Sequence, residues 1–149
     1  MKKAIVPLLS TIICIGAFSV DALACSCGPP PGISQAYLDA DAVFLAKVKS
    51  VDTSNEYVIR SNLLVIQSWK GASEPNVVTE ALTGCCPCDF NFTKNAFYIV
   101  YADRPEGSSA GEPTYHVSSC GRTTMLDTPE MELEILNALK KKVEGGATE

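Results

Sequence analysis

The most apolar of the strands that the sequence predicts is Ala96-Phe97-Tyr98-Ile99-Val100-Tyr101-Ala102. Most of its residues are aromatic or β-branched, and such residues favour strands. A strand with apolar residues at successive positions is buried on both faces. We therefore expect this stretch at the centre of a sheet or barrel.

Shorter patterns surround this strand. Alternating apolar residues bounded by polar, Pro-rich or Gly-rich turns predict further strands at 41–51, 57–70, 76–82, 90–92 and 114–119. Ile33 to Asp39 fits a short helix. A second helix starts near Pro129, with a core-facing stripe of Ile135, Leu136, Leu139 and Val143. The sequence therefore predicts an all-β barrel of five or six strands with a short N-terminal helix and a C-terminal helix.

The first 24 residues have the three parts of a secretory signal. Lys2 and Lys3 begin it, an apolar run over 4–20 follows, and Ala22-Leu23-Ala24 places small residues at the cleavage site. The apolar run is short for a bilayer span. We expect cleavage after residue 24, a domain over 25–144, a disordered tail over 145–149, and a secreted or periplasmic protein.

Cys25 would then be the first residue of the mature chain. A cysteine at this position also marks bacterial lipoproteins, in which it is acylated. Such sites usually have Leu three residues before the Cys and a small residue two before, and Ala22 and Leu23 have the reverse order. A free amine on Cys25 is the preferred interpretation. A lipoprotein at the outer surface of a membrane is the alternative.

Six cysteines follow the signal, and an even number in an exported chain predicts disulfides. They are Cys25, Cys27, Cys85, Cys86, Cys88 and Cys120. The chain has a net charge of −5 and no basic stripe, which argues against nucleic-acid binding. Behind Cys27, the run Pro29-Pro30-Pro31 favours a stiff extended segment.

Several motifs in this order resemble the inhibitory domain of the tissue inhibitors of metalloproteinases, within the netrin-like family of OB-fold modules. The resemblance covers nearly all of residues 25–143. The motifs are Cys25-Ser26-Cys27, Ala40-Asp41-Ala42-Val43-Phe44, Trp69-Lys70-Gly71, Cys88-Asp89-Phe90, Phe97-Tyr98-Ile99-Val100-Tyr101-Ala102 and Ser119-Cys120-Gly121-Arg122-Thr123.

The resemblance implies a Greek-key OB-fold barrel and an inhibitor of metalloproteases. The sequence has no serine elbow, phosphate loop or metalloprotease helix, so we expect no enzymatic activity. We also expect a monomer that needs no cofactor. In this family the free amine and the carbonyl of the first residue, here Cys25, displace water from the zinc of a target metalloprotease. The second residue, here Ser26, points into the specificity pocket of the protease. The resemblance also implies disulfides from Cys25 to Cys88 and from Cys27 to Cys120, although six cysteines allow fifteen connectivities.

Cys85 and Cys86 do not fit the family pattern, because the cysteines that form its usual third bridge are missing. They could form a vicinal disulfide, stay reduced or join another chain. Cys85 and Cys88 also match a redox spacing, and a zinc site could be formed by Cys25, Cys27, Cys85 and Cys88. An exported chain favours disulfides over both.

Other candidate residues have structural interpretations. His116 is the only histidine and lies in a predicted strand, so we expect a structural role. Asp39 and Asp41 fit solvated turn carboxylates better than an acid and base pair, and Trp69 fits the core. The leading hypothesis is a metalloprotease inhibitor. The alternative is a non-inhibitory exported binding or adhesion module, lipid-anchored at Cys25.

Overall fold

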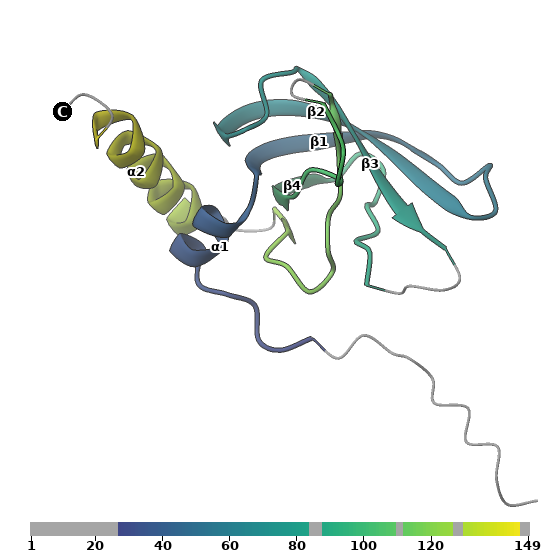
Figure 1. Ribbon diagram of the computed structural model, residues 1–149, viewed down its shortest axis with the longest axis horizontal. Coiled ribbons are helices and arrows are strands. Elements are labelled where there is room, and N and C mark those ends of the chain that lie inside the picture. Colours follow the sequence, from purple (N-terminus) through teal and green to yellow (C-terminus); the bar gives the residue numbers. More distant parts are fainter. Residues whose placement is uncertain (1–26, 84–87, 110–111, 127–129, 147–149) are drawn as a thin grey trace, which may run out of the picture.

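A six-stranded mixed sheet and two helices form the body of the molecule (Figure 1). The computed structural model describes residues 27–83, 88–109, 112–126 and 130–146. The elements in chain order are α1 (Ile33–Asp39), β1 (Ala42–Asp52), β2 (Val58–Lys70), β3 (Asn76–Leu82), β4 (Phe97–Ala102), β5 (Thr114–Tyr115), β6 (Thr124–Met125) and α2 (Glu130–Gly146). The predicted mainly-β composition with one helix near each end is confirmed.

The strands lie in the order β5-β3-β2-β1-β4-β6. β1 pairs antiparallel with both β2 and β4, so that Phe44 faces Ser68 on one side and Val100 on the other. β3 pairs antiparallel with β2 and parallel with β5. β1 and β2 therefore occupy the middle of the sheet. The apolar strand β4, which was expected at the centre, lies between β1 and the short strand β6.

The ends of this sheet do not pair with each other, so the described strands form no closed barrel. The register between β1 and β2 shifts at three places, and such bulges increase the twist of a sheet. Asp103 after β4 and His116 after β5 form an isolated bridge and exchange two backbone hydrogen bonds of 2.9 Å. This bridge joins the segment after β4 to the segment after β5, across the side on which the sheet is not closed, here called the opening of the sheet.

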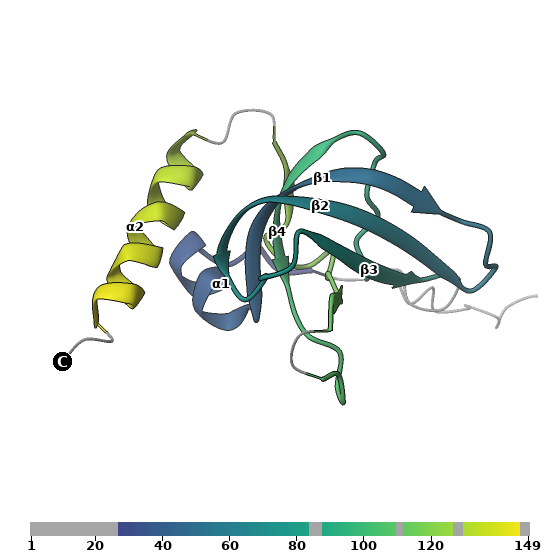
Figure 2. The ribbon, with the colours of Figure 1, turned by 90° about the horizontal axis from the view of Figure 1, so that it is seen from above.

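Alternation along β1 divides the core into two parts. Phe44, Ala46 and Val48 are fully buried on one face, among side chains of the other strands. Val43 is buried on the opposite face, together with Trp69, Tyr101 and residues of both helices. α1 and α2 lie next to each other at one end of the sheet (Figure 2).

The helices attach to the sheet through a few specific contacts. Tyr37 of α1 donates from its hydroxyl to the carbonyl of Trp69 at 3.0 Å, and Leu136 of α2 is fully buried. The predicted core position of Trp69 is confirmed, because its exposed fraction is 4 %. The predicted inward position of Val143 is wrong, since this side chain is 56 % exposed. α2 also continues to Gly146, beyond the predicted domain end.

Two strand predictions are wrong in part. Residues 90–92 form no strand, and instead the rings of Phe90 and Phe92 pack against each other and against Tyr98, with centroids 4.8 to 5.6 Å apart. The predicted strand at 114–119 is reduced to β5, followed by single bridges. β6 was not predicted, because both its residues are exposed and show no alternation.

Candidate functional site

A disulfide joins Cys27 to Cys120, 93 positions later, with the two Cα atoms 5.2 Å apart. This is the second pairing that the family resemblance implies. Cys27 is exposed and is the first residue that the structure describes. The proposed zinc-contacting residues Cys25 and Ser26 lie outside the described residues, as do Cys85 and Cys86.

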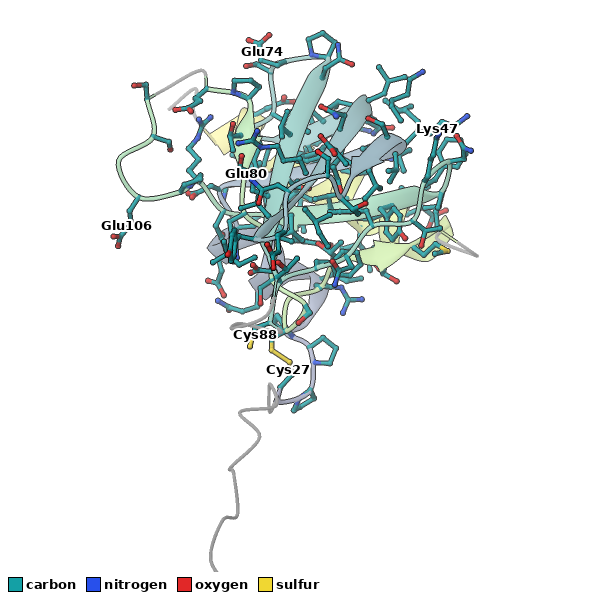
Figure 3. All side chains as sticks on the ribbon, turned by 90° about the vertical axis from the view of Figure 1, so that its right-hand side faces the viewer. Cys27, Lys47, Glu74, Glu80, Cys88 and Glu106 are labelled. Atoms are coloured by element: carbon teal, nitrogen blue, oxygen red, sulfur yellow. A yellow bond between two sulfur atoms is a disulfide. The ribbon has the colours of Figure 1, made fainter. Side chains whose placement is uncertain are left out.

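Cys88 lies in a short segment (residues 88–90) that runs beside residues 117–119. Ser119 donates to the carbonyl of Cys88 from its backbone N–H at 2.7 Å and from its hydroxyl at 2.9 Å. The N–H of Phe90 donates to the carbonyl of Val117 at 2.8 Å. Cys27 and Cys88 therefore lie at the same end of the molecule (Figure 3). Cys88 is disulfide-bonded, and its implied partner, Cys25, is outside the described residues.

Asp89 fixes this segment to two other parts of the chain. Its Oδ1 lies 2.6 Å from Nε2 of His116, and its Oδ2 accepts a hydrogen bond of 2.6 Å from the N–H of Leu82 at the end of β3. Asp89 is 11 % exposed, whereas His116 is 46 % exposed. The contact gives His116 a structural partner, as its predicted role requires. The partner itself was missed, because 27 positions separate the two residues.

The segment from Cys27 to Pro31, here called the N-terminal segment, has few ways to bond to the body. Its three prolines have no backbone N–H to donate. Among the described residues, one hydrogen bond reaches it: Nη1 of Arg122 donates to the carbonyl of Pro31 at 3.1 Å. Arg122 is two residues from Cys120, so one short stretch of chain makes both the disulfide and this bond.

The guanidinium of Arg122 also forms an ion pair with Glu132 of α2. Nε lies 3.1 Å from Oε1, and Nη2 lies 3.3 Å from Oε2. The side chains are only 24 % and 14 % exposed. The hydroxyl of Tyr101 on β4 donates to the same Oε1 at 2.8 Å. Burial raises the pKa of Tyr101, and the hydrogen bond to the charged Glu132 raises it further.

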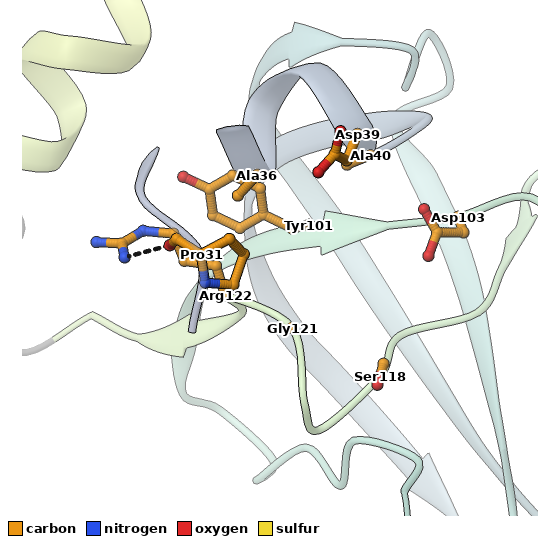
Figure 4. A pocket seen from close by; sticks show the side chains of 9 residues that line it. All are labelled: Pro31, Ala36, Asp39, Ala40, Tyr101, Asp103, Ser118, Gly121 and Arg122. Atoms are coloured by element: carbon orange, nitrogen blue, oxygen red, sulfur yellow. Dashed lines mark hydrogen bonds between the residues drawn. The ribbon is translucent and has the colours of Figure 1, made fainter. Parts of the chain in front are cut away.

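A cavity of about 110 Å³ lies between α1 and the stretch that holds Arg122 (Figure 4). It is lined by Pro31, Ala36, Asp39, Ala40, Tyr101, Asp103, Ser118, Gly121 and Arg122. Pockets that enclose organic ligands usually measure about 300 to 1,000 Å³. This cavity has room for a few water molecules, and Pro31 is the residue of the N-terminal segment that lines it.

A larger pocket of about 450 Å³ lies at the opening of the sheet, between β3 and the bridged residues Asp103 and His116. The guanidinium of Arg104 lies over the ring of Tyr115 there, 5.3 Å from its centroid. Nη1 of Arg104 is buried and has no hydrogen-bond partner among the described residues. Carboxylates from Glu80, Asp89, Asp103 and Glu106 share the lining. Arg104 and His116 are the basic groups of this lining, so acidic groups outnumber basic ones.

The alternative four-sulfur zinc site is wrong, because Cys27 and Cys88 are both in disulfides and cannot supply thiolates. The described ranges contain no other group of three or more His, Cys, Asp or Glu residues that could hold a metal ion. A redox dithiol usually opens a helix, whereas Cys88 lies in a turn and is followed by the bridge residue Asp89, so it does not open a helix.

Asp39, the last residue of α1, and Asp41, in the bend before β1, make separate contacts. Oδ1 of Asp39 accepts from Nε2 of Gln35 at 2.7 Å. Oδ2 of Asp41 accepts from the backbone N–H of Arg104 at 2.9 Å. Both residues are exposed and bind different partners, as solvated carboxylates do.

Sequence reasoning missed Glu132 and the role of Arg122. Arg122 lies inside one of the motifs that carry the family resemblance, but its charge partner is on a different element. An arginine that is largely buried usually has an acidic partner, so a buried position for Arg122 would have predicted that such a partner exists. It could not have chosen Glu132 from the several glutamates of α2.

Comparison of the sequence with models of known protein families and with curated proteins finds no match in either set. In the part of the chain that the structure covers, none of the helices has the length and apolar character to cross a bilayer.

Proposed function

We propose that this chain is an exported inhibitor of zinc metalloproteases, acting through the free amine and carbonyl of Cys25. The observation that carries the proposal is the disulfide from exposed Cys27 to Cys120. It fixes the chain two residues after the proposed zinc ligand. Two residues span at most about 7 Å, so Cys25 stays close to this fixed point.

The chemistry of the terminus suits a catalytic zinc. Such a zinc has three protein ligands and an open position that water occupies. An α-amine has a pKa of about 8, so it loses its proton readily when a metal binds it. The carbonyl oxygen of the same residue is near enough to complete a chelate. Ser26 would then enter the specificity pocket, which a small polar side chain fills without a clash.

A terminus that is ordered before binding loses less entropy when it binds. The Cys27–Cys120 disulfide, the three prolines and the hydrogen bond from Arg122 to Pro31 all restrict the N-terminal segment. The implied disulfide from Cys25 to Cys88 would restrict the terminus further. Cys88 is held beside Cys120 by the two hydrogen bonds from Ser119, which favours this pairing.

The sheet also supports the proposed family. We propose that it is an OB-type barrel, a five-stranded Greek-key barrel that is partly open. A parallel contact between β3 and β5, and a β1 strand shared by β2 and β4, favour this assignment. The bridge between Asp103 and His116 would mark the remaining closure.

The test is inhibition of a panel of zinc metalloproteases by the mature protein and by a variant with one alanine added before Cys25. The proposal expects inhibition by the mature protein and none by the extended variant, because the added residue converts the amine to an amide. A variant with one alanine after Glu149 is the matched control and should inhibit normally. Equal inhibition by both extended forms would overturn zinc chelation.

Intact-mass analysis of the exported protein separates this function from that of a lipid-anchored binding module. A mass that fits cleavage after Ala24 and no adduct supports the inhibitor. A lipid adduct on Cys25 would remove the amine that chelation requires and would exclude the proposal.

A further inference from the structure

We infer that α2 positions the N-terminal segment through Arg122, which makes Arg122 and Glu132 positioning residues for the proposed inhibitory terminus. The inference rests on the proposed function for its effect on inhibition, and on the geometry alone for its effect on the order of the segment. Arg122 joins three elements: the N-terminal segment through Pro31, α2 through Glu132, and β4 through the bond of Glu132 to Tyr101.

The guanidinium of Arg122 has a fixed, planar set of donors. Its Nε and Nη2 both bind the carboxylate of Glu132, and this two-point contact sets the orientation of the whole group. Nη1, which is left over, then points at the carbonyl of Pro31. The direction of the donor to Pro31 therefore depends on Glu132, which makes no described contact with the N-terminal segment.

Glu132 is in turn held from two sides. The Tyr101 hydroxyl fixes Oε1 from the sheet. The backbone of α2 is fixed by the fully buried Leu136, by Asn137, which accepts from Nε1 of Trp69 at 2.8 Å, and by Lys140, which donates to the carbonyl of Ser68 at 3.0 Å. A shift of α2 on the sheet would therefore move the carboxylate and, with it, the donor to Pro31.

The disulfide does not make this contact redundant. The disulfide fixes the segment at Cys27, and α1, whose residues Ala36 and Tyr37 are buried, fixes the chain from Ile33 onward. The bond to Pro31 fixes a third point between these two and limits how far the proline run can move away from the body. The direction of the segment is what would aim Cys25 and Ser26 at a protease.

The test measures backbone order at Gly28 and Gly32 by ¹⁵N relaxation in the mature protein. The variant Arg122→Met removes every donor, and the double variant R122M/E132Q also avoids leaving a buried unpaired carboxylate. We expect order parameters near 0.85 in the wild type and a fall towards 0.6 in both variants, with the sheet amides unchanged. Glu132→Gln alone should give a smaller fall, because it weakens the ion pair without removing the carbonyl oxygen.

Arg60→Gln is the matched control. It breaks another salt bridge, Arg60 to Glu80 at 2.7 Å, which lies between β2 and β3 and does not touch the N-terminal segment. It should leave the order at Gly28 and Gly32 unchanged. Wild-type order at both glycines in folded R122M/E132Q would overturn the inference, and so would an equal loss of order in R60Q.

Inhibition assays on the same variants then separate the two proposals. If the proposed function holds, R122M/E132Q should inhibit about tenfold less strongly than R60Q, because the terminus must be ordered on binding. If the order parameters at Gly28 and Gly32 fall in R122M/E132Q but the wild-type protein inhibits no protease, the positioning role of Arg122 is supported and the proposed function is contradicted. If the wild-type protein inhibits a protease but the order parameters at Gly28 and Gly32 are unchanged in R122M/E132Q, only the positioning role of Arg122 is contradicted.

Discussion

Asp89 and His116 are joined by a contact of 2.6 Å between Oδ1 and Nε2, across 27 positions of sequence. The other oxygen of the same carboxylate accepts the N–H of Leu82. One side chain thus connects the segment that holds Cys88 to the end of β3 and to the bridge after β5. These contacts add to the hydrogen bonds from Ser119 that hold the backbone of Cys88.

Replacing Asp89 should therefore destabilise the fold. Asp89→Ala removes the hydrogen bond to the N–H of Leu82 and the contact with the ring of His116, and a hydrogen bond contributes about 0.5 to 1.5 kcal/mol to stability. Urea unfolding should show this loss. Glu106→Ala, an exposed acid on the same pocket, is the control and should change the free energy of unfolding by less than about 0.5 kcal/mol. Equal effects of the two changes would contradict the structural role of Asp89.

Gly71 should not tolerate a side chain. Its φ is +71°, and a Cβ atom there would overlap the carbonyl oxygen of Asp41. Gly107 has a similar φ of +80° but open space around it. Gly107→Ala should cost about 1 kcal/mol from backbone strain alone, and Gly71→Ala clearly more, because the backbone of Asp41 must also move. Thermal unfolding of both variants checks the difference, and an equal loss would argue against the close approach.

Leu136 should make the largest apolar contribution to the packing of the C-terminal helix. Leu136 is fully buried and Val143 is 56 % exposed. Leu136→Ala should cost about 2 to 5 kcal/mol in a denaturant titration, because it leaves a cavity between α2 and the sheet. Val143→Ala removes apolar carbon from the same helix and should cost less than about 0.5 kcal/mol. A large effect at Val143 would mean that α2 packs by the stripe that its periodicity predicts.

The stability of the protein should fall at high pH through Tyr101. Burial and the hydrogen bond to Glu132 raise the pKa of this phenol above its ordinary value, so the folded state holds its proton more tightly than the unfolded state. The stabilisation is complete below pH of about 10 and is lost as the pH rises towards the folded pKa.

Tyr101→Phe removes this contribution while keeping the ring. The difference in unfolding free energy between wild type and Y101F should shrink above pH 10 by up to about 1.4 kcal/mol for each pH unit. If the unfolding free energies of the two proteins change in parallel between pH 8 and pH 11.5, the raised pKa of Tyr101 is contradicted.

Local sequence patterns predicted most of the regular elements. The helix at 33–39 and the strand at 76–82 have the predicted bounds, since proline, glycine and polar residues mark their ends. β4 was found from its apolar run alone. The strand expected at 90–92 is not formed. It was predicted because two phenylalanines separated by one residue fit the alternation of a strand. In the structure their rings pack on Tyr98, and the nearby backbone forms a single bridge at Asp89.

The site was predicted less completely than the fold. The cysteines and prolines stand out by type and spacing, so the N-terminal segment and its bridge could be proposed from sequence. The contacts of Arg122 with Glu132 and of Asp89 with His116 depend on how distant elements pack. No periodicity encodes such pairs, because any acidic residue on the right face of α2 would satisfy the same pattern.

The central claim is that the amine of Cys25 binds the catalytic metal of a protease. The most direct measurement is the visible absorption of a cobalt-substituted metalloprotease titrated with the mature protein or with the same protein acetylated at its N-terminus. Binding of a nitrogen ligand in place of water changes the cobalt spectrum. The account predicts a change with the free terminus and none with the acetylated one. The same spectrum with both proteins, at concentrations where the free form inhibits, would contradict it.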